Sequence, residues 1–101
     1  MYKRQKEKGV DLIACVSVND PFVMKAWGED RNVGEDVMML SDGNGEFTAA
    51  IGLEMDGSGF GLGTRSQRYA MIIDDGAVSV LNVEQGPGLD VSSADTVLEQ
   101  L

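Results

Sequence analysis

The chain contains no histidine and only one cysteine, Cys15. Histidine is the commonest general base and the commonest protein ligand of transition metals, so a Ser-His-Asp triad and a histidine-based zinc site are both excluded. A single cysteine cannot form a disulfide within the chain. A disulfide of Cys15 would therefore need a second thiol from elsewhere.

Positive charge is scarce as well. Eight Lys and Arg stand against 17 Asp and Glu, which gives a formal net charge of −9. Such a chain is repelled by nucleic acids and by anionic membrane surfaces, so neither is expected as a partner. No apolar run approaches the roughly 20 residues that span a bilayer, and no signal peptide is recognisable, so we expect a cytoplasmic location.

The length and apolar content fit one small globular unit. The chain has 101 residues, of which 43% are hydrophobic, an ordinary fraction for a folded protein. We therefore expect residues 1–101 to belong to a single domain.

The segment 12–18 is the most informative stretch. It is short, apolar and rich in β-branched residues, which is typical of a strand buried on both faces. Asn19 or Asp20 can cap a helix, Pro21 fits its first turn, and Gly28 is a suitable end for a helix over 22–27. In open α/β sheets, functional sites lie at the carboxyl ends of such strands, which here is the turn at 19–21.

The rest of the chain predicts further short elements. Asp74-Asp75-Gly76 is a strong hairpin signal, and Ser92 or Ser93 can cap a final helix. Asp42 to Glu46 is interpreted as a turn, because it lacks the glycine and glutamate of a calcium loop. The expected strands are 37–40, 69–73 and 77–83. A helix is expected at 46–53, with Phe47, Ala50, Ile51 and Leu53 on its apolar face. The other expectations are the end of a surface helix at 2–8, a glycine-rich irregular stretch at 56–63 and a break at 86–88.

Four segments carry a resemblance to a known family: 14–27 (ACVSVNDPFVMKAW), 42–48 (DGNGEFT), 59–71 (GFGLGTRSQRYAM) and 80–84 (VLNVE). In this order they resemble type II peroxiredoxins, the peroxiredoxin five subfamily. The resemblance covers nearly the whole chain from residue 9 onward. It implies an α/β, thioredoxin-like fold.

One family motif is absent from this sequence. Members carry Pro-x-x-x-Thr-x-x-Cys, with the peroxide-reacting cysteine, upstream of the matching region, and this sequence has no such pattern. The resemblance therefore implies a partial thioredoxin-like domain, truncated at its N-terminus. It also implies that a central strand is missing between the strands at 12–18 and 69–73. We expect such a chain to be marginally stable, rearranged or prone to aggregation.

The resemblance also assigns candidate functional residues. It implies that Arg68 holds the peroxidatic thiolate and the peroxide oxygens; the alternative is a surface arginine in a salt bridge. Arg65 is the weaker candidate for that role. Cys15 is either a small buried core residue or the resolving cysteine of an intact parent. Phe60 and Leu62 are candidates for a dimer interface, with core packing as the alternative.

Two functions remain open from the sequence. The first is the C-terminal part of a thiol peroxidase that reduces hydrogen peroxide and alkyl hydroperoxides, with glutathione and glutaredoxin or thioredoxin as reductant. The resemblance implies a homodimer with no metal or organic cofactor. This chain alone should then be inactive. The second is a non-enzymatic thioredoxin-like module that is stabilised by self-association or by a strand from a partner.

Overall fold

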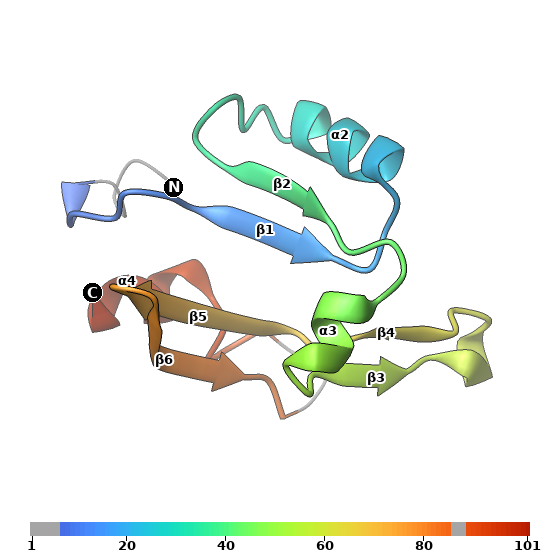
Figure 1. Cartoon of the computed structure of the whole chain (residues 1–101). Helices are drawn as coiled ribbons and strands as arrows, with labels where there is room; N and C mark the ends of the chain where they lie inside the picture. The colour runs from blue at the N-terminus through green and yellow to red at the C-terminus, as the bar shows by residue number, and fades with distance from the viewer. Residues whose placement is uncertain (1–6, 86–88) are drawn as a thin grey trace.

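The computed structural model describes residues 7–85 and 89–101 (Figure 1). Its elements are β1 (Ala14–Ser17), α2 (Pro21–Asp30), β2 (Met38–Ser41), α3 (Glu46–Ala50), β3 (Glu54–Asp56), the 3₁₀ turn η1 (Ser58–Phe60), β4 (Thr64–Ser66), β5 (Tyr69–Asp74), β6 (Ala77–Val83) and α4 (Ala94–Gln100). Of the predicted features, most of the helix end at 2–8 and all of the break at 86–88 lie outside the described residues. None of the helices in the described ranges is long and apolar enough to cross a membrane.

The strands form three separate pairs. β1 lies parallel to β2, whereas β3 pairs antiparallel with β4 and β5 antiparallel with β6. Figure 1 shows the β1–β2 pair, covered by α2, above the β5–β6 pair. Within the described residues no ladder joins β1 to β5, so each of these strands has one unpaired edge.

The prediction that the first strand is buried on both faces is wrong. β1 is shorter than the apolar run, Ala14 is exposed, and the other three residues are half-buried. Leu12, before the strand, is 60% exposed. The reason is a missing neighbour: in the described part of the chain, β2 is the one strand that pairs with β1. Their ladder is flanked by two bonds of 2.9 Å, from the Met38 N–H to the Ile13 carbonyl and from the Asp42 N–H to the Ser17 carbonyl.

Helix α2 begins as predicted and ends later than predicted. The Asp20 carboxylate accepts the Val23 N–H at 2.8 Å, so Asp20 and not Asn19 is the cap, and Pro21 occupies the first turn. Gly28 does not end the helix, which continues to Asp30. Gly28 is instead a packing position, because a Cβ there would lie 3.0 Å from the Cγ of Met39 on β2.

The middle of the chain differs most from expectation. Helix α3 stops at Ala50, and its buried residue is Thr48. The predicted apolar face is wrong for Phe47, which is 44% exposed, but Leu53, beyond the end of the helix, is buried as predicted. The irregular stretch predicted at 56–63 forms the connection of a β3–β4 hairpin and contains η1, whereas the two short strands themselves are not predicted. Gly57 allows this tight closure, since a Cβ at this position would lie 2.9 Å from the Cβ of Leu62.

The C-terminal part follows the sequence signals closely. Asp75 and Gly76 have φ values of 51° and 79°, as the predicted Asp-Gly hairpin turn requires. Ser93 is the cap of α4, and its Oγ accepts the Thr96 N–H at 3.2 Å.

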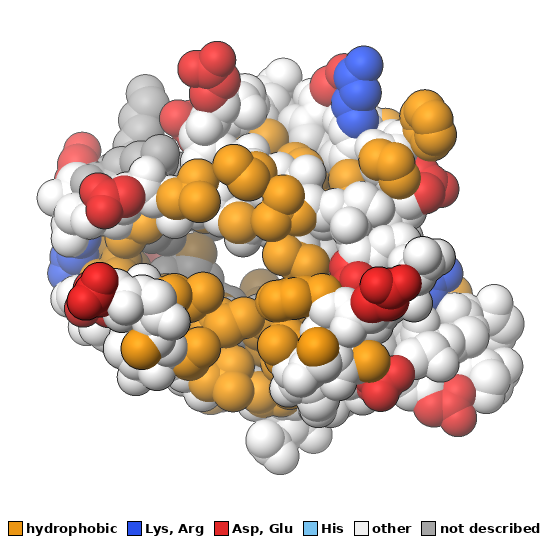
Figure 2. Space-filling view, in the orientation of Figure 1, with side chains coloured by type: hydrophobic (Ala, Val, Ile, Leu, Met, Phe, Trp, Pro, Cys, Tyr) orange, Lys and Arg blue, Asp and Glu red, His pale blue; other side chains and the backbone are white. Residues whose placement is uncertain are grey.

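The buried core is small for a chain of this length. Five hydrophobic side chains are buried in the described residues: Met24, Val33, Val37, Leu53 and Leu98. Many large apolar side chains remain exposed, among them Ile73 and Leu81 on the β5–β6 pair. Figure 2 shows an opening between the upper and lower halves, bordered by hydrophobic side chains. This opening corresponds to the side on which β1 and β5 have no strand partner.

Glu84 ties the chain after β6 to the start of α4. Its Oε2 accepts the Asp90 N–H at 2.8 Å, the Ser92 N–H at 2.9 Å and the Ser92 hydroxyl at 2.6 Å. The Ser92 hydroxyl is the largest influence, and together these donors lower the pKa of Glu84 from 4.5 to about 2. The ionised carboxylate is therefore the form that the folded chain favours.

This contact predicts a specific acid sensitivity. Because the pKa of Glu84 is lowered on folding, its stabilising effect is complete above pH 4.5 and is lost as the pH falls towards about 2. We expect Glu84→Gln to reduce proton uptake on acid unfolding over this interval by about one proton per chain. Urea unfolding followed as a function of pH measures this. Glu99→Gln, at an exposed position of α4, is the control; an equal effect there would contradict the assignment.

Candidate functional site

The turn after β1 is held by side chains from both parallel strands. The Asn19 amide nitrogen donates to Ser17 Oγ at 2.7 Å, and Ser41 Oγ at the end of β2 donates to the Asn19 carbonyl at 2.6 Å. Parallel strands end at the same edge of their sheet, so these polar groups gather at the carboxyl ends of β1 and β2. This is the edge at which the sequence predicts a site.

Arg65 connects this turn to the β3–β4 hairpin. Its Nη1 donates to the Val18 carbonyl at 2.6 Å and to Asn19 Oδ1 at 3.2 Å, while its Nε donates to the Leu62 carbonyl at 2.8 Å. A polar pocket of about 350 Å³ lies beside these contacts. Arg65 is therefore a structural clamp. The sequence did not indicate this role, because Arg65 lies 47 residues after Val18 and 46 residues after Asn19.

Asp42 organises the other side of the turn. Its carboxylate accepts the Phe47 N–H at 3.1 Å, the Thr48 N–H at 2.8 Å and the Thr48 hydroxyl at 2.6 Å. The Thr48 hydroxyl is the main cause of a lowered pKa of Asp42. The sequence does not indicate this role, because Gly45 is the residue before the helix and Asp42 lies three residues upstream of that cap position.

Cys15 and Tyr69 lie in the partly buried region between these elements. Burial raises the pKa of the Cys15 thiol above its ordinary 9.0, so the protonated thiol is its form at neutral pH. Burial also raises the pKa of Tyr69, and the negative charge of Asp42 and, at alkaline pH, that of the ionised Cys15 thiol add to the effect. Cys15 on β1, Asp42 after β2 and Tyr69 on β5 thus interact electrostatically across three segments. Cys15 has no depressed pKa that would make it a reactive thiolate on its own.

Arg68 lies immediately before β5. Its backbone carbonyl accepts the Glu84 N–H at 2.9 Å, which fixes the start of the β5–β6 ladder. Its side chain is exposed and makes no hydrogen bond or ion pair with residues 7–85 or 89–101. The guanidinium is thus available to an anion or to another part of a larger protein.

Phe60 and Leu62 are exposed on the glycine-rich loop. Phe60 is 88% exposed and Leu62 47% exposed, so neither is a core residue in this chain. The Arg65 clamp holds the Leu62 backbone. The loop therefore exposes two apolar side chains, and its backbone is held at Leu62 by Arg65.

Comparison with known proteins supports the resemblance to peroxiredoxins along nearly the whole chain. Residues 1–98 match the Redoxin family. The chain is 53% identical to Peroxiredoxin-2E, chloroplastic, of Arabidopsis thaliana, over 95% of this chain and 42% of that protein. It is also 53% identical to Peroxiredoxin-2B of Arabidopsis thaliana, over 95% of this chain and 59% of that protein.

A solved structure shares the arrangement of the elements. Reduced Prx3 of Vibrio vulnificus, crystallised in complex with H₂O₂, superposes with a TM-score of 0.92 at 62% identity, covering 98% of this chain and 63% of that one. This similarity confirms the predicted thioredoxin-like peroxiredoxin fold. The chain spans about half the length of the curated relatives described above. The chain belongs to the redoxin family and corresponds to part of a peroxiredoxin.

Proposed function

We propose that this chain supplies part of a thiol peroxidase that reduces hydrogen peroxide and alkyl hydroperoxides. The observation that carries the proposal is the match to peroxiredoxins over 95% of the chain. The exposed side chain of Arg68, which has no partner within the described ranges, supports it.

The chemistry divides between an upstream segment and this chain. A cysteine thiolate on the upstream segment attacks one peroxide oxygen, the O–O bond breaks, and the second oxygen leaves as hydroxide or alkoxide and takes up a proton. The product on the cysteine is a sulfenic acid, which glutathione with glutaredoxin, or thioredoxin, reduces to the thiol. Arg68 stays protonated, lowers the pKa of the attacking thiol and stabilises the charge that develops on the peroxide oxygens.

The assembly and location belong to the same proposal. Residues 1–101 form one partial domain, and the active protein is a homodimer in which Phe60 and Leu62 contact the second copy; their exposure supports this. We place the protein in the cytoplasm. Cys15 serves as the resolving cysteine or as a core residue. Its raised pKa favours the core role, because a resolving cysteine attacks a sulfenic acid as the thiolate.

The test compares peroxide consumption by two proteins in the presence of glutathione and glutaredoxin. One is this chain alone, and the other is this chain joined to an upstream peroxiredoxin segment that carries Pro-x-x-x-Thr-x-x-Cys. We expect turnover only in the joined protein, because the reactive thiolate is absent from this sequence. A well-folded joined protein without activity would refute the proposal.

A second candidate function rests on the unpaired edges of β1 and β5. A non-enzymatic module that binds a strand from a second copy of this chain, or from another protein, would use the same edges. Self-association of this chain at micromolar concentration, together with an inactive joined protein, would favour this candidate over the peroxidase.

A further inference from the structure

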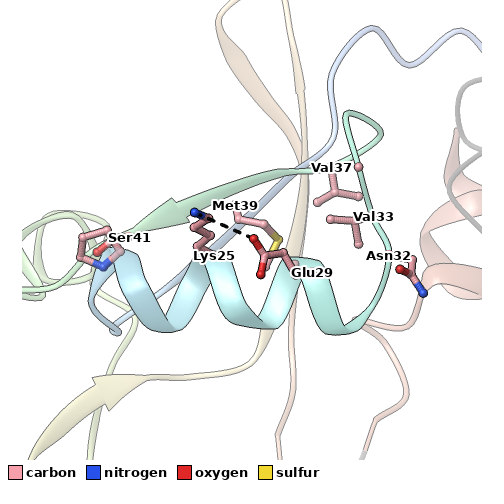
Figure 3. A pocket seen from close by; sticks show the side chains of 10 residues that line it. Lys25, Glu29, Asn32, Val33, Val37, Met39 and Ser41 are labelled. Atoms are coloured by element: carbon pink, nitrogen blue, oxygen red, sulfur yellow. Dashed lines mark ion pairs between the residues drawn. The ribbon is translucent and has the colours of Figure 1, made fainter.

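A groove runs between α2 and the outer edge of β2, on the side away from β1. Its volume is about 730 Å³, within the range of specific binding sites. Figure 3 shows Val33, Val37 and Met39 beside the groove and the Lys25–Glu29 ion pair across its helical side. The two charged atoms of that pair are 4.0 Å apart and both side chains are largely exposed. The groove thus has an apolar floor and a polar rim.

The outer edge of β2 presents unused backbone groups to this groove. The N–H groups of Met38 and Asp42 point to β1, where they bond to the carbonyls of Ile13 and Ser17. Because successive backbone groups of a strand point to opposite sides, those of Met39 and Ser41 point outward. Neither has a backbone partner within the described part of the chain, and both residues line the groove.

The charge of the surrounding segment limits what can bind there. The charged residues that line the groove are Lys25 and Glu29. The adjoining residues 30–36 add three acidic residues, Asp30, Glu35 and Asp36, and one basic residue, Arg31. The basic residues, Lys25 and Arg31, each lie near an acidic neighbour, Glu29 at 4.0 Å and Asp30 at 3.9 Å. A second copy of a chain with net charge −9 would bring further negative charge to this surface, whereas a basic segment would be attracted.

We propose that the groove between α2 and β2 binds an extended, basic peptide segment of another protein, which adds as a strand to the β2 edge. The backbone groups of Met39 and Ser41 pair with the peptide, and one apolar peptide side chain packs on Val33 and Val37. Lysine or arginine side chains of the peptide lie against the acidic residues at the end of α2 and in the loop that follows it, which are Glu29, Asp30, Glu35 and Asp36. This site is independent of the peroxidase chemistry proposed above.

The test uses a fluorescein-labelled octapeptide of alternating valine and lysine, titrated against the intact chain and followed by fluorescence anisotropy. Ser41→Pro removes an outward N–H, while Ser41→Ala keeps that N–H and removes only the hydroxyl. We expect Ser41→Pro to bind at least about tenfold more weakly than Ser41→Ala. The paired substitutions Glu35→Lys and Asp36→Lys should weaken binding by a similar factor, and replacing the lysines of the peptide with glutamates should abolish it.

Amide hydrogen exchange locates the bound peptide. The proposal requires new protection at Met39 and Ser41 and none at Ala14 and Val16, which face the opening beside β1. Protection at Ala14 and Val16 instead, or a concentration-dependent dimer that protects Met39 without peptide, would overturn it. If Ser41→Pro fails to fold, the variant with Glu35→Lys and Asp36→Lys decides the outcome. The proposal is rejected if this variant binds the peptide as tightly as the parent chain does.

Discussion

Arg68→Ala, introduced into the protein that joins this chain to an upstream peroxiredoxin segment, is expected to lower kcat/KM for hydrogen peroxide by at least about a hundredfold. The side chain is exposed and unpaired within the described residues, so its removal deletes no structural contact there. The loss should come from chemistry: the attacking thiol loses a cation that lowers its pKa, and the breaking O–O bond loses a donor. Stopped-flow peroxide consumption measures the rate.

A second readout separates this role from a structural one. The pH dependence of alkylation of the upstream cysteine should shift to higher pH in Arg68→Ala, because a nearby cation favours the thiolate. Arg31→Ala is the matched control, since Arg31 is an exposed arginine whose only described ion pair is a 3.9 Å contact with Asp30. If Arg68→Ala stays within threefold of the parent and the thiol titrates unchanged, Arg68 does not have the proposed role.

Arg65→Ala should behave differently from Arg68→Ala in the same protein. Arg65 donates three hydrogen bonds that join the β3–β4 hairpin and the glycine-rich loop to the turn after β1. Hydrogen bonds from charged groups contribute about 1.5–3 kcal/mol each. We therefore expect Arg65→Ala to act mainly by lowering the free energy of unfolding. The two arginines are three residues apart in sequence, yet within residues 7–85 and 89–101 the Arg65 side chain has hydrogen-bond partners and the Arg68 side chain has none.

Local signals in the sequence were sufficient for the ends of several elements. Pro21 in the first turn of α2 and the Asp75-Gly76 turn are predictable because each signal acts within three or four residues. The same kind of signal limits the cap of α4 to Ser92 or Ser93, and the structure has Ser93. The resemblance of the four segments to peroxiredoxins gave the fold, and the family match confirmed it. These features required no knowledge of which segments meet in space.

Contacts between distant segments could not be predicted in the same way. Gly28 has the features of a helix end, but its place in α2 reflects packing on β2, because a Cβ at this position would lie 3.0 Å from the Cγ of Met39. The Arg65 clamp and the Asp42 bonds to α3 likewise connect residues that no periodic pattern relates. The burial of β1 was overestimated because an apolar strand is buried only when neighbours cover both its edges and its faces.

Joining the upstream segment should also change the stability of this chain. We expect the joined protein to unfold cooperatively, with a midpoint at least about 15 °C above that of this chain alone. β1 and β5 each have one unpaired edge, where the backbone groups of Ala14, Val16, Tyr69 and Met71 lack a ladder partner. A strand placed between them adds ladder bonds worth about 0.5–1.5 kcal/mol each. It also covers the apolar side chains that border the opening in Figure 2.

The decisive comparison uses a matched variant in which proline replaces the central residue of the added strand. Proline removes one ladder donor and distorts a central strand, so this variant should lose most of the gain in midpoint although its composition is nearly the same. Differential scanning calorimetry measures the midpoints, and sedimentation equilibrium establishes that each protein is monomeric or dimeric under the same conditions. If the prediction holds, this chain alone cannot unfold cooperatively as a monomer at the same midpoint as the joined protein. Such a result would show that the open edges of β1 and β5 do not lower the stability of the fold. In that case the five buried hydrophobic residues of the small core would be sufficient to hold the fold.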